Sequence, residues 1–223
     1  MKKTPQVVGI ALACAAGYIV LAILAHAQPW LFFDVGATRT LQHLRSGPLD
    51  LFMKTVSWPG YFPEFVPIFA AVLLVMYRLR LKVEAMIMTV AEIGVAVMGF
   101  VVKPIVGRHR PPTSQVWVND YIPKDPYTFT AGHVHTYMVI FGFIVFLAAT
   151  QIPRGRWQRP TLIWGSVLFL VLTGISRVYL GDHWASDVIG AYLAGGFWLC
   201  LAIVAYLQLT GRGARTRLAR AAD

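Results

Sequence analysis

Long apolar runs are the feature of this sequence that most restricts what it can fold into. A helix needs roughly 20 mostly apolar residues to cross the hydrocarbon core of a bilayer. Runs of about that length recur along the chain and predict six transmembrane helices. The expected helices cover residues 6–27, 60–77, 83–102, 134–152, 160–176 and 188–209. We therefore expect an all-α, polytopic membrane protein that folds as a six-helix bundle.

The composition agrees with a membrane protein rather than with a soluble domain. The chain has 223 residues, of which 57% are hydrophobic and 13% are charged, whereas soluble domains carry about 25% charged residues. Neither an internal repeat nor a low-complexity linker interrupts it, so a single domain over residues 1–223 is expected. Cys14 and Cys200 both lie in apolar runs and are interpreted as packing residues.

The net charge of +10 could indicate nucleic-acid binding, but the positions of the basic residues argue against it. They lie between the apolar runs instead of along one amphipathic face, which is typical of membrane topology signals. We therefore expect the bilayer, and no nucleic acid, as a partner of the chain. The oligomeric state is left open.

The Lys and Arg residues also predict the orientation, because cytoplasmic loops are enriched in them. With the N-terminus in the cytoplasm, twelve of the 20 lie inside and eight outside. The inside group is Lys2, Lys3, Arg78, Arg80, Lys82, Arg154, Arg156, Arg159, Arg212, Arg215, Arg217 and Arg220, and the outside group is Arg39, Arg45, Lys54, Lys103, Arg108, Arg110, Lys124 and Arg177. Residues 1–27 also resemble a signal peptide, but their apolar run is longer than a usual signal core, which favours a retained helix.

A shorter apolar pattern follows the first expected crossing. Leu49, Phe52, Met53 and Val56 recur at helical spacing after a Gly-Pro break. This spacing fits an amphipathic helix lying at the membrane interface, and it fits a short helix packed on the bundle equally well.

Polar side chains gather in three clusters at helix ends on the expected outer face. A charge costs less at a helix end than at the bilayer centre, since water and headgroups reach it. Arg offers a planar fork and Lys a point charge for phosphate oxygens, and the N-terminal end of a helix also favours an anion. The clusters therefore predict one phosphate-binding pocket. They contain Lys103 and Arg110, then Gly132 and His133, then Ser176, Arg177, His183 and Asp187.

Two histidines in these clusters suit opposed roles in phosphoryl transfer. His183 and Asp187 are four residues apart at the start of the last expected helix, and hence share a face. The carboxylate can hold one ring nitrogen and stabilise an imidazolium, which leaves the other nitrogen free to attack. His133, on another helix, can protonate the departing oxygen. With three cations nearby, the pattern predicts a phosphoryl-transfer site.

These clusters resemble the motifs of the type 2 phosphatidic acid phosphatase (PAP2) family of membrane lipid phosphatases. The first and third motifs, Lys-x6-Arg-Pro and Ser-Arg-x5-His-x3-Asp, are matched by Lys103, Arg110, Pro111, Ser176, Arg177, His183 and Asp187. The resemblance implies a covalent phosphohistidine on His183, Asp187 as its partner and His133 as the acid. It also implies no metal and no other cofactor, with Lys103, Arg110, Arg177, Ser176 and Gly132 binding the phosphate.

The second motif departs from the family pattern of Pro-Ser-Gly-His. Thr130 and Ala131 precede Gly132 and His133 here. Ala131 has no hydroxyl for the phosphate, so either backbone N–H groups or Thr130 would have to serve instead. The loss of one hydrogen bond to a charged group costs about 1.5–3 kcal/mol.

Some residues near the motifs have less specific interpretations. Asp182 is expected to cap the N-terminus of the last helix. Arg108 faces headgroups or substrate, with headgroups favoured. Glu92, in mid-helix, is either functional or a hydrogen-bonded structural group. Ala191 and Gly195 form a small-xxx-small pair that is typical of helix packing.

The leading hypothesis is a metal-independent phosphatase that hydrolyses lipid phosphates at the outer leaflet of a bacterial inner membrane. The expected substrate is a lipid phosphomonoester or diphosphate, such as polyprenyl diphosphate, phosphatidylglycerol phosphate or phosphatidic acid. The alternatives are a non-hydrolytic binding or transport protein for such lipids and a lipid phosphotransferase. A metal hydrolase that uses His133, His135, His183 and Asp187 is disfavoured, because three cations nearby would repel a metal.

Overall fold

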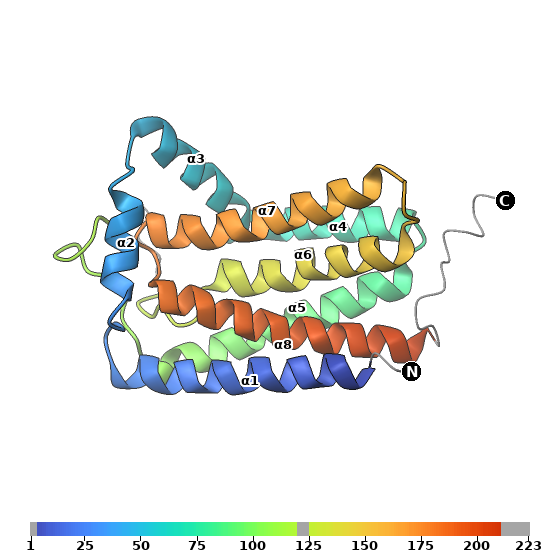
Figure 1. Cartoon of the computed structure of the whole chain (residues 1–223), viewed down its shortest axis with the longest axis horizontal. Coiled ribbons are helices and arrows are strands. Elements are labelled where there is room, and N and C mark those ends of the chain that lie inside the picture. The colour runs from blue at the N-terminus through green and yellow to red at the C-terminus, as the bar shows by residue number, and fades with distance from the viewer. Residues whose placement is uncertain (1–3, 120–124, 211–223) are drawn as a thin grey trace.

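The computed structural model describes residues 4–119 and 125–210, and all regular structure within these ranges is helical. Figure 1 shows the long helices running side by side along one axis, with the short helix α2 across one end. The helices are α1 (Thr4–Ala27), α2 (Asp34–Gln42), α3 (Gly47–Ser57), the 3-10 turn η1 (Trp58–Gly60), α4 (Phe65–Arg78), α5 (Lys82–Val106), α6 (Gly132–Gln151), α7 (Gln158–Tyr179) and α8 (Ala185–Leu209).

Five of the six predicted crossings are confirmed. α1, α5, α6, α7 and α8 are each long and apolar enough to span a membrane. Their ends lie within four residues of the predicted ones, because the apolar runs stop where charged residues or prolines begin. The all-helical, multi-pass architecture expected from the sequence is thus the architecture observed.

The second predicted crossing, residues 60–77, is wrong as a single helix. α4 has 14 residues, which at 1.5 Å per residue covers about 21 Å and falls short of the hydrocarbon core. It reaches the length of a span only together with residues 47–60, to which it is joined at an angle of 66°. This bent pair of helices is therefore the candidate for the second crossing.

The helix α3 settles the two interpretations of the amphipathic segment. Met53 and Val56 are buried, and Met53 packs with Tyr179 and Leu180 at the end of α7. Phe52 on the other side is about half exposed. The segment is thus a short helix packed on the bundle, and Figure 1 shows it lying obliquely beside α7.

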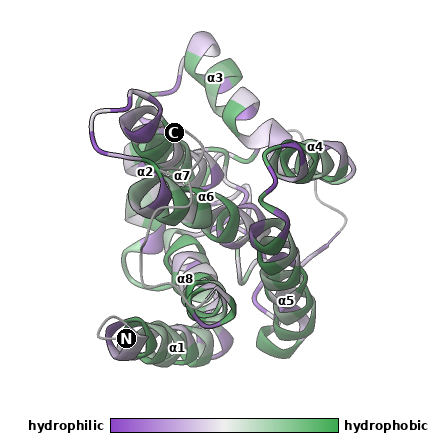
Figure 2. Cartoon of the chain, turned by 90° about the vertical axis from the view of Figure 1, so that its right-hand side faces the viewer, coloured by the Kyte–Doolittle hydropathy of each residue, from purple (hydrophilic) through white to green (hydrophobic). Residues whose placement is uncertain are grey.

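The core of the bundle forms around α8. This helix packs against α1, α5 and α6, and the view along the bundle in Figure 2 shows it between these neighbours. The largest apolar cluster joins α5, α6 and α8 and includes Met88, Val95, Phe143 and Tyr206. Apolar side chains such as Ile23 on α1 and Phe100 on α5 are exposed on the outside, as expected of surfaces that face lipid.

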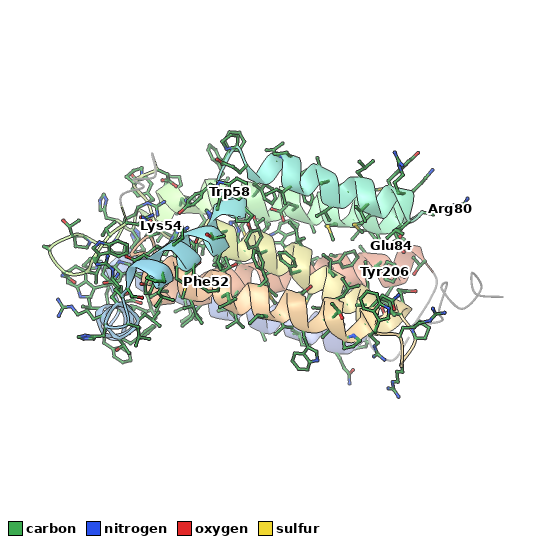
Figure 3. All side chains as sticks on the ribbon, turned by 90° about the horizontal axis from the view of Figure 1, so that it is seen from above. Phe52, Lys54, Trp58, Arg80, Glu84 and Tyr206 are labelled. Carbon is green, nitrogen blue, oxygen red and sulfur yellow. The ribbon has the colours of Figure 1, made fainter. Side chains whose placement is uncertain are left out.

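The basic residues separate between the two ends of the bundle as the topology prediction requires. Arg80 lies at the end opposite to Lys54 in Figure 3. The turns between α4 and α5 and between α6 and α7 carry Arg78, Arg80, Lys82, Arg154, Arg156 and Arg159. The predicted signals Lys2, Lys3, Lys124, Arg212, Arg215, Arg217 and Arg220 lie outside the described residues.

A glycine sets the distance between α6 and α8. A Cβ added to Gly195 would lie 2.6 Å from the Met138 Cβ and 2.7 Å from the His135 carbonyl oxygen. Backbone atoms cannot rotate away from such a contact, so the two helices would have to separate. The packing role predicted for this glycine agrees with its position.

We predict that Gly195→Ala lowers the free energy of unfolding by about 1–3 kcal/mol through overpacking. Thermal unfolding of the detergent-solubilised protein measures the effect. Gly165→Ala on α7 is the matched control, because no atom lies within 4 Å of the added Cβ. Equal melting temperatures for the two variants would contradict the prediction.

Candidate active site

The three predicted clusters meet at the end of the bundle that carries α2 (Figure 1). Lys103 lies in the last turn of α5, His133 is the second residue of α6, and His183 lies in the turn between α7 and α8. Lys103, Arg110 and Arg177 all act electrostatically on both His133 and His183. The fold therefore brings these five residues together, although 80 positions separate the first from the last.

The ring of His183 is buried and held on one side. Its Nδ1 lies 2.9 Å from the backbone oxygen of Thr128 and 2.9 Å from the Thr128 hydroxyl. The hydroxyl lies 2.8 Å from Asp187 Oδ2 and donates its single proton there. Nδ1 must then carry the proton that it donates to Thr128, which leaves Nε2 unprotonated and able to attack.

Thr128 therefore stands between the histidine and the carboxylate that were expected to touch. Within the described residues no hydrogen bond or ion pair joins His183 to Asp187 directly. Asp187 Oδ2 also accepts the Trp184 N–H at 2.9 Å and so caps α8. Sequence reasoning missed Thr128 because it lies outside the motif spacings, and only the fold brings it to His183.

Asp187 is in turn fixed by a buried ion-pair network around Arg108. Arg108 lies 2.6 Å from Asp187 Oδ1 and 2.7 Å from Asp34 Oδ2. It also donates to Ser186 Oγ at 2.7 Å and to the Pro29 oxygen at 3.1 Å. All three charged side chains are fully buried. Arg108 thus faces neither headgroups nor a phosphate, and it holds α2 against the start of α8.

The three motif cations contact two aspartates. Arg177 lies 2.7 Å from Asp182 Oδ2, and Lys103 forms an ion pair with Asp125. Arg110 donates to the backbone oxygens of both aspartates, at 2.9 Å to Asp125 and 2.8 Å to Asp182. The expectation that Asp182 caps α8 is wrong, because its carboxylate is drawn to the buried charge of Arg177 and Asp187 takes the cap.

His133 packs against the corner of the bent helix pair. A Cβ on Gly60 would lie 2.3 Å from its ring, so only glycine permits this approach. The rings of Tyr61 and His133 pack edge-on, with their centroids 4.7 Å apart. The Tyr61 hydroxyl accepts a hydrogen bond from Arg177 at 2.9 Å. His133 Nε2 is buried without a partner among the described residues, so it is available to a ligand.

The remaining predicted positions differ in their surroundings. The amides of Gly132 and His133 open α6 and have no acceptor in the described part of the chain. Ser176 donates to the Thr173 oxygen at 2.8 Å and contacts Ser57 Oγ at 2.8 Å. Its hydroxyl therefore links α7 to α3, and its contacts do not include any of the three cations.

The altered second motif is buried at the start of α6. Ala131 is fully buried and precedes α6. The Thr130 methyl would lie 3.4 Å from a Cβ on Gly190, so this methyl faces α8. The Thr130 hydroxyl oxygen is buried with no hydrogen-bond partner among the described residues. This hydroxyl and the amides that open α6 are therefore the candidates to replace the family serine.

Family comparison supplies the context for this site. The profile of the PAP2 superfamily matches residues 84–210, which is more than half of the chain. The chain belongs to the PAP2 superfamily. This confirms the resemblance drawn from the motifs, and the matched region contains every predicted site residue.

Relatives of this PAP2 protein agree with the assignment. Phosphatidylglycerophosphatase B of Bacillus subtilis (strain 168) is 22% identical over 182 residues, covering 80% of this chain and 85% of the relative. The transmembrane PAP2 type phosphatidylglycerolphosphate phosphatase from Bacillus subtilis superposes with a TM-score of 0.76 at 20% identity, covering 92% of this chain and 98% of that one. The structure of Aquifex aeolicus LpxE superposes with a TM-score of 0.60 at 19% sequence identity. This match covers 81% of the present chain and 96% of LpxE. These structural matches show a shared fold.

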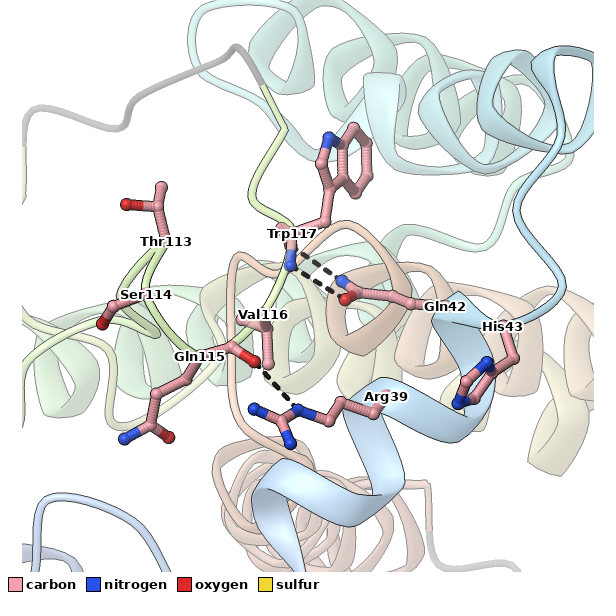
Figure 4. A pocket seen from close by; sticks show the side chains of 8 residues that line it. All are labelled: Arg39, Gln42, His43, Thr113, Ser114, Gln115, Val116 and Trp117. Atoms are coloured by element: carbon pink, nitrogen blue, oxygen red, sulfur yellow. Dashed lines mark hydrogen bonds between the residues drawn. The ribbon is translucent and has the colours of Figure 1, made fainter.

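Two hollows flank the site at this end of the PAP2 fold. One, of about 360 Å³, lies between α2 and residues 113–117. Figure 4 shows the Gln42 amide bonded to both backbone groups of Trp117, which pins this loop to α2. The other, of about 530 Å³, lies at the bent corner and has Tyr61 in its wall. Only the second hollow adjoins a residue that contacts the cations.

Burial, together with the charges of the site, shifts the pKa values of two residues in the turn between α7 and α8. Burial lowers the pKa of His183 well below its ordinary value, and Arg110 and Arg177 lower it further. Burial raises the pKa of Asp182 despite the opposing effect of Arg177. Among the described residues no three His, Cys, Asp or Glu side chains converge in a way that could hold a metal ion. The four residues considered for a metal hydrolase thus do not form a ligand group.

We predict that His183 remains neutral at pH 6, where a free histidine with a pKa of about 6.5 is mostly protonated. A lowered pKa means that the proton binds only well below that pH. NMR of histidine-labelled protein, with His183→Gln to assign the signal by difference, measures the titration. A midpoint near 6.5 would contradict the prediction.

Proposed function

We propose that this PAP2 protein is a metal-independent phosphatase that removes a terminal phosphate from a membrane lipid through a phosphohistidine on His183. The observation that carries the proposal is the buried His183 ring, held at Nδ1 by Thr128 and close enough to three cations and to His133 to feel their charge. Phosphoryl transfer needs a nucleophile and positive charge close to the phosphoryl oxygens, and the grouping of His183 with three cations supports both requirements.

The first half-reaction follows from the proton positions. His183 Nε2 attacks phosphorus, the bond to the lipid oxygen breaks, and protonated His133 donates its proton to that oxygen. The imidazolium of His183 keeps its Nδ1 proton against Thr128, whose hydroxyl connects it to Asp187. Lys103, Arg110 and Arg177 neutralise the phosphoryl oxygens, with the amides that open α6.

The second half-reaction reverses these roles. His133, now neutral, takes a proton from a water molecule that attacks the phosphohistidine. The P–N bond breaks, inorganic phosphate forms, and His183 recovers its free Nε2. A phosphotransferase would share the first half and differ only in the acceptor, so the identity of the released product separates the two.

The surroundings of the site favour a lipid as substrate. The hollow of about 530 Å³ at the bent corner is lined by three aromatic residues and four others, namely Trp58, Tyr61, Phe62, Lys54, Pro63, Glu64 and Asn119. Trp58 and Phe62 are exposed where lipid would lie, and Tyr61 reaches Arg177. A headgroup can thus meet the cations while its tails stay in the bilayer, and the names of the relatives make phosphatidylglycerol phosphate the first candidate.

The proposed site faces the outside of a bacterial inner membrane. The positively charged turns between α4 and α5 and between α6 and α7 lie at the opposite end of the bundle. Because such turns favour the cytoplasm, the site would meet lipids of the outer leaflet.

We predict that the purified protein releases inorganic phosphate from phosphatidylglycerol phosphate, phosphatidic acid or a polyprenyl diphosphate, and that His183→Ala abolishes the release. Without the nucleophile no covalent intermediate forms. His43→Ala, an exposed histidine at the same end, is the matched control and should be fully active.

Three outcomes would contradict this proposal. Phosphate release that persists in His183→Ala would exclude the phosphohistidine on that residue. Lipid binding without any release by the wild-type protein would favour the binding or transport alternative. Loss of activity in a chelator, measured against the same assay without it, would favour a metal hydrolase.

We predict that Thr128→Val lowers kcat roughly 10- to 100-fold with little change in KM, as expected for a lost hydrogen bond to a charged group. The substitution keeps the backbone oxygen that orients Nδ1 and removes the hydroxyl that contacts both Nδ1 and Asp187. Thr173→Val is the matched control, because its buried hydroxyl oxygen has no partner. A kcat of Thr128→Val equal to that of the control would show that the connection from His183 through Thr128 to Asp187 does not contribute to catalysis.

A further inference from the structure

Two aspartates of the protein itself partly neutralise the cations Lys103, Arg110 and Arg177. The carboxylate of Asp125 forms an ion pair with Lys103, and that of Asp182 forms one with Arg177. The backbone oxygens of both aspartates accept hydrogen bonds from Arg110. A phosphate that enters the cluster must therefore compete with carboxylates for the same N–H donors. The two aspartates differ in how easily they can give way.

Asp182 is a fixed member of the cluster. Its side chain and that of Arg177 are each 1% exposed, and it lies next to His183 in the chain. Separating a fully buried pair leaves an unpaired charge in a medium of low polarity, which costs several kcal/mol. We therefore expect the ion pair between Asp182 and Arg177 to remain intact when a ligand binds.

Asp125, in contrast, is placed where it can leave. Its side chain is 39% exposed, and it lies in irregular structure before α6 rather than in a helix. Oδ2 contacts Lys103, while Oδ1 accepts the Tyr127 N–H at 3.0 Å. Rotation of this side chain breaks a partly exposed ion pair and the hydrogen bond from the Tyr127 N–H, and it leaves the Arg110 contact to the backbone oxygen in place. The carboxylate therefore marks a position on Lys103 that a phosphoryl oxygen can take over.

We propose that the Asp125 carboxylate competes with phosphate for Lys103. The carboxylate leaves Lys103 when the substrate phosphate binds, and it pairs with Lys103 again after hydrolysis, which displaces inorganic phosphate. The inference rests on the proposed phosphatase function, in which Lys103 binds the phosphoryl group. Binding that is equally strong in the substrate and product states does not raise kcat and slows product release. A carboxylate that weakens all anion binding by the same amount therefore favours turnover.

The test compares Asp125→Asn with the wild-type full-length protein in detergent. The asparagine keeps an oxygen for the Tyr127 N–H and removes the charge. We expect inorganic phosphate to bind roughly fivefold more tightly, equivalent to about 1 kcal/mol. Product inhibition of lipid-phosphate hydrolysis and thermal stabilisation by inorganic phosphate both measure this affinity. Asp125→Glu, which restores the charge, should return it towards the wild-type value.

Asp50→Asn is the matched control, because Asp50 forms a surface ion pair with Arg45 at 2.9 Å and contacts none of the three cations. It should leave phosphate affinity unchanged. Unchanged or weaker phosphate binding in Asp125→Asn would overturn the inference. It would indicate that Asp125 positions the Lys103 side chain instead of competing with phosphate for it. Thermal stabilisation needs no turnover, so a wild-type protein that binds phosphate without hydrolysing lipids would contradict the proposed function alone.

Discussion

The site depends on one buried cation, Arg108, held between Asp34 and Asp187. Removing one partner of a buried ion pair typically costs 3–5 kcal/mol, because the remaining charge has no water to solvate it. The network joins the start of α2, the segment after α5 and the first turn of α8. It ties these segments together at the end of the bundle where the three motifs meet.

The same network orients the proposed nucleophile through a chain of contacts. Arg108 fixes Asp187, Asp187 accepts the Thr128 hydroxyl, and Thr128 holds His183 Nδ1. Three contacts therefore connect the buried Arg108 to the ring of His183. Because the Thr128 hydroxyl donates its proton to Asp187, Nδ1 is the ring nitrogen that carries a proton.

The sequence predicted the residue types of the site better than their contacts. Apolar run length located five crossings because burial in lipid tolerates few charges, and motif spacing identified Lys103, Arg110, His133, Arg177 and His183. The spacing of four residues between His183 and Asp187 suggested a direct bond. His183 instead precedes α8, so helical spacing does not apply, and Thr128 fills the gap. No local pattern distinguishes Arg108 from the cations that face a ligand, because its partners Asp34 and Asp187 lie 74 and 79 positions away.

The broken second crossing has a reason in the site rather than in the membrane. A straight helix through residues 47–78 could not place its backbone against His133, whereas the bend brings Gly60 within van der Waals distance of that ring. The next residue, Tyr61, then reaches Arg177 with its hydroxyl and His133 with its ring. The hollow lined by Trp58 and Phe62 lies at the same bend. One departure from regular helix thus packs against the proposed acid and forms the wall of the hollow next to it.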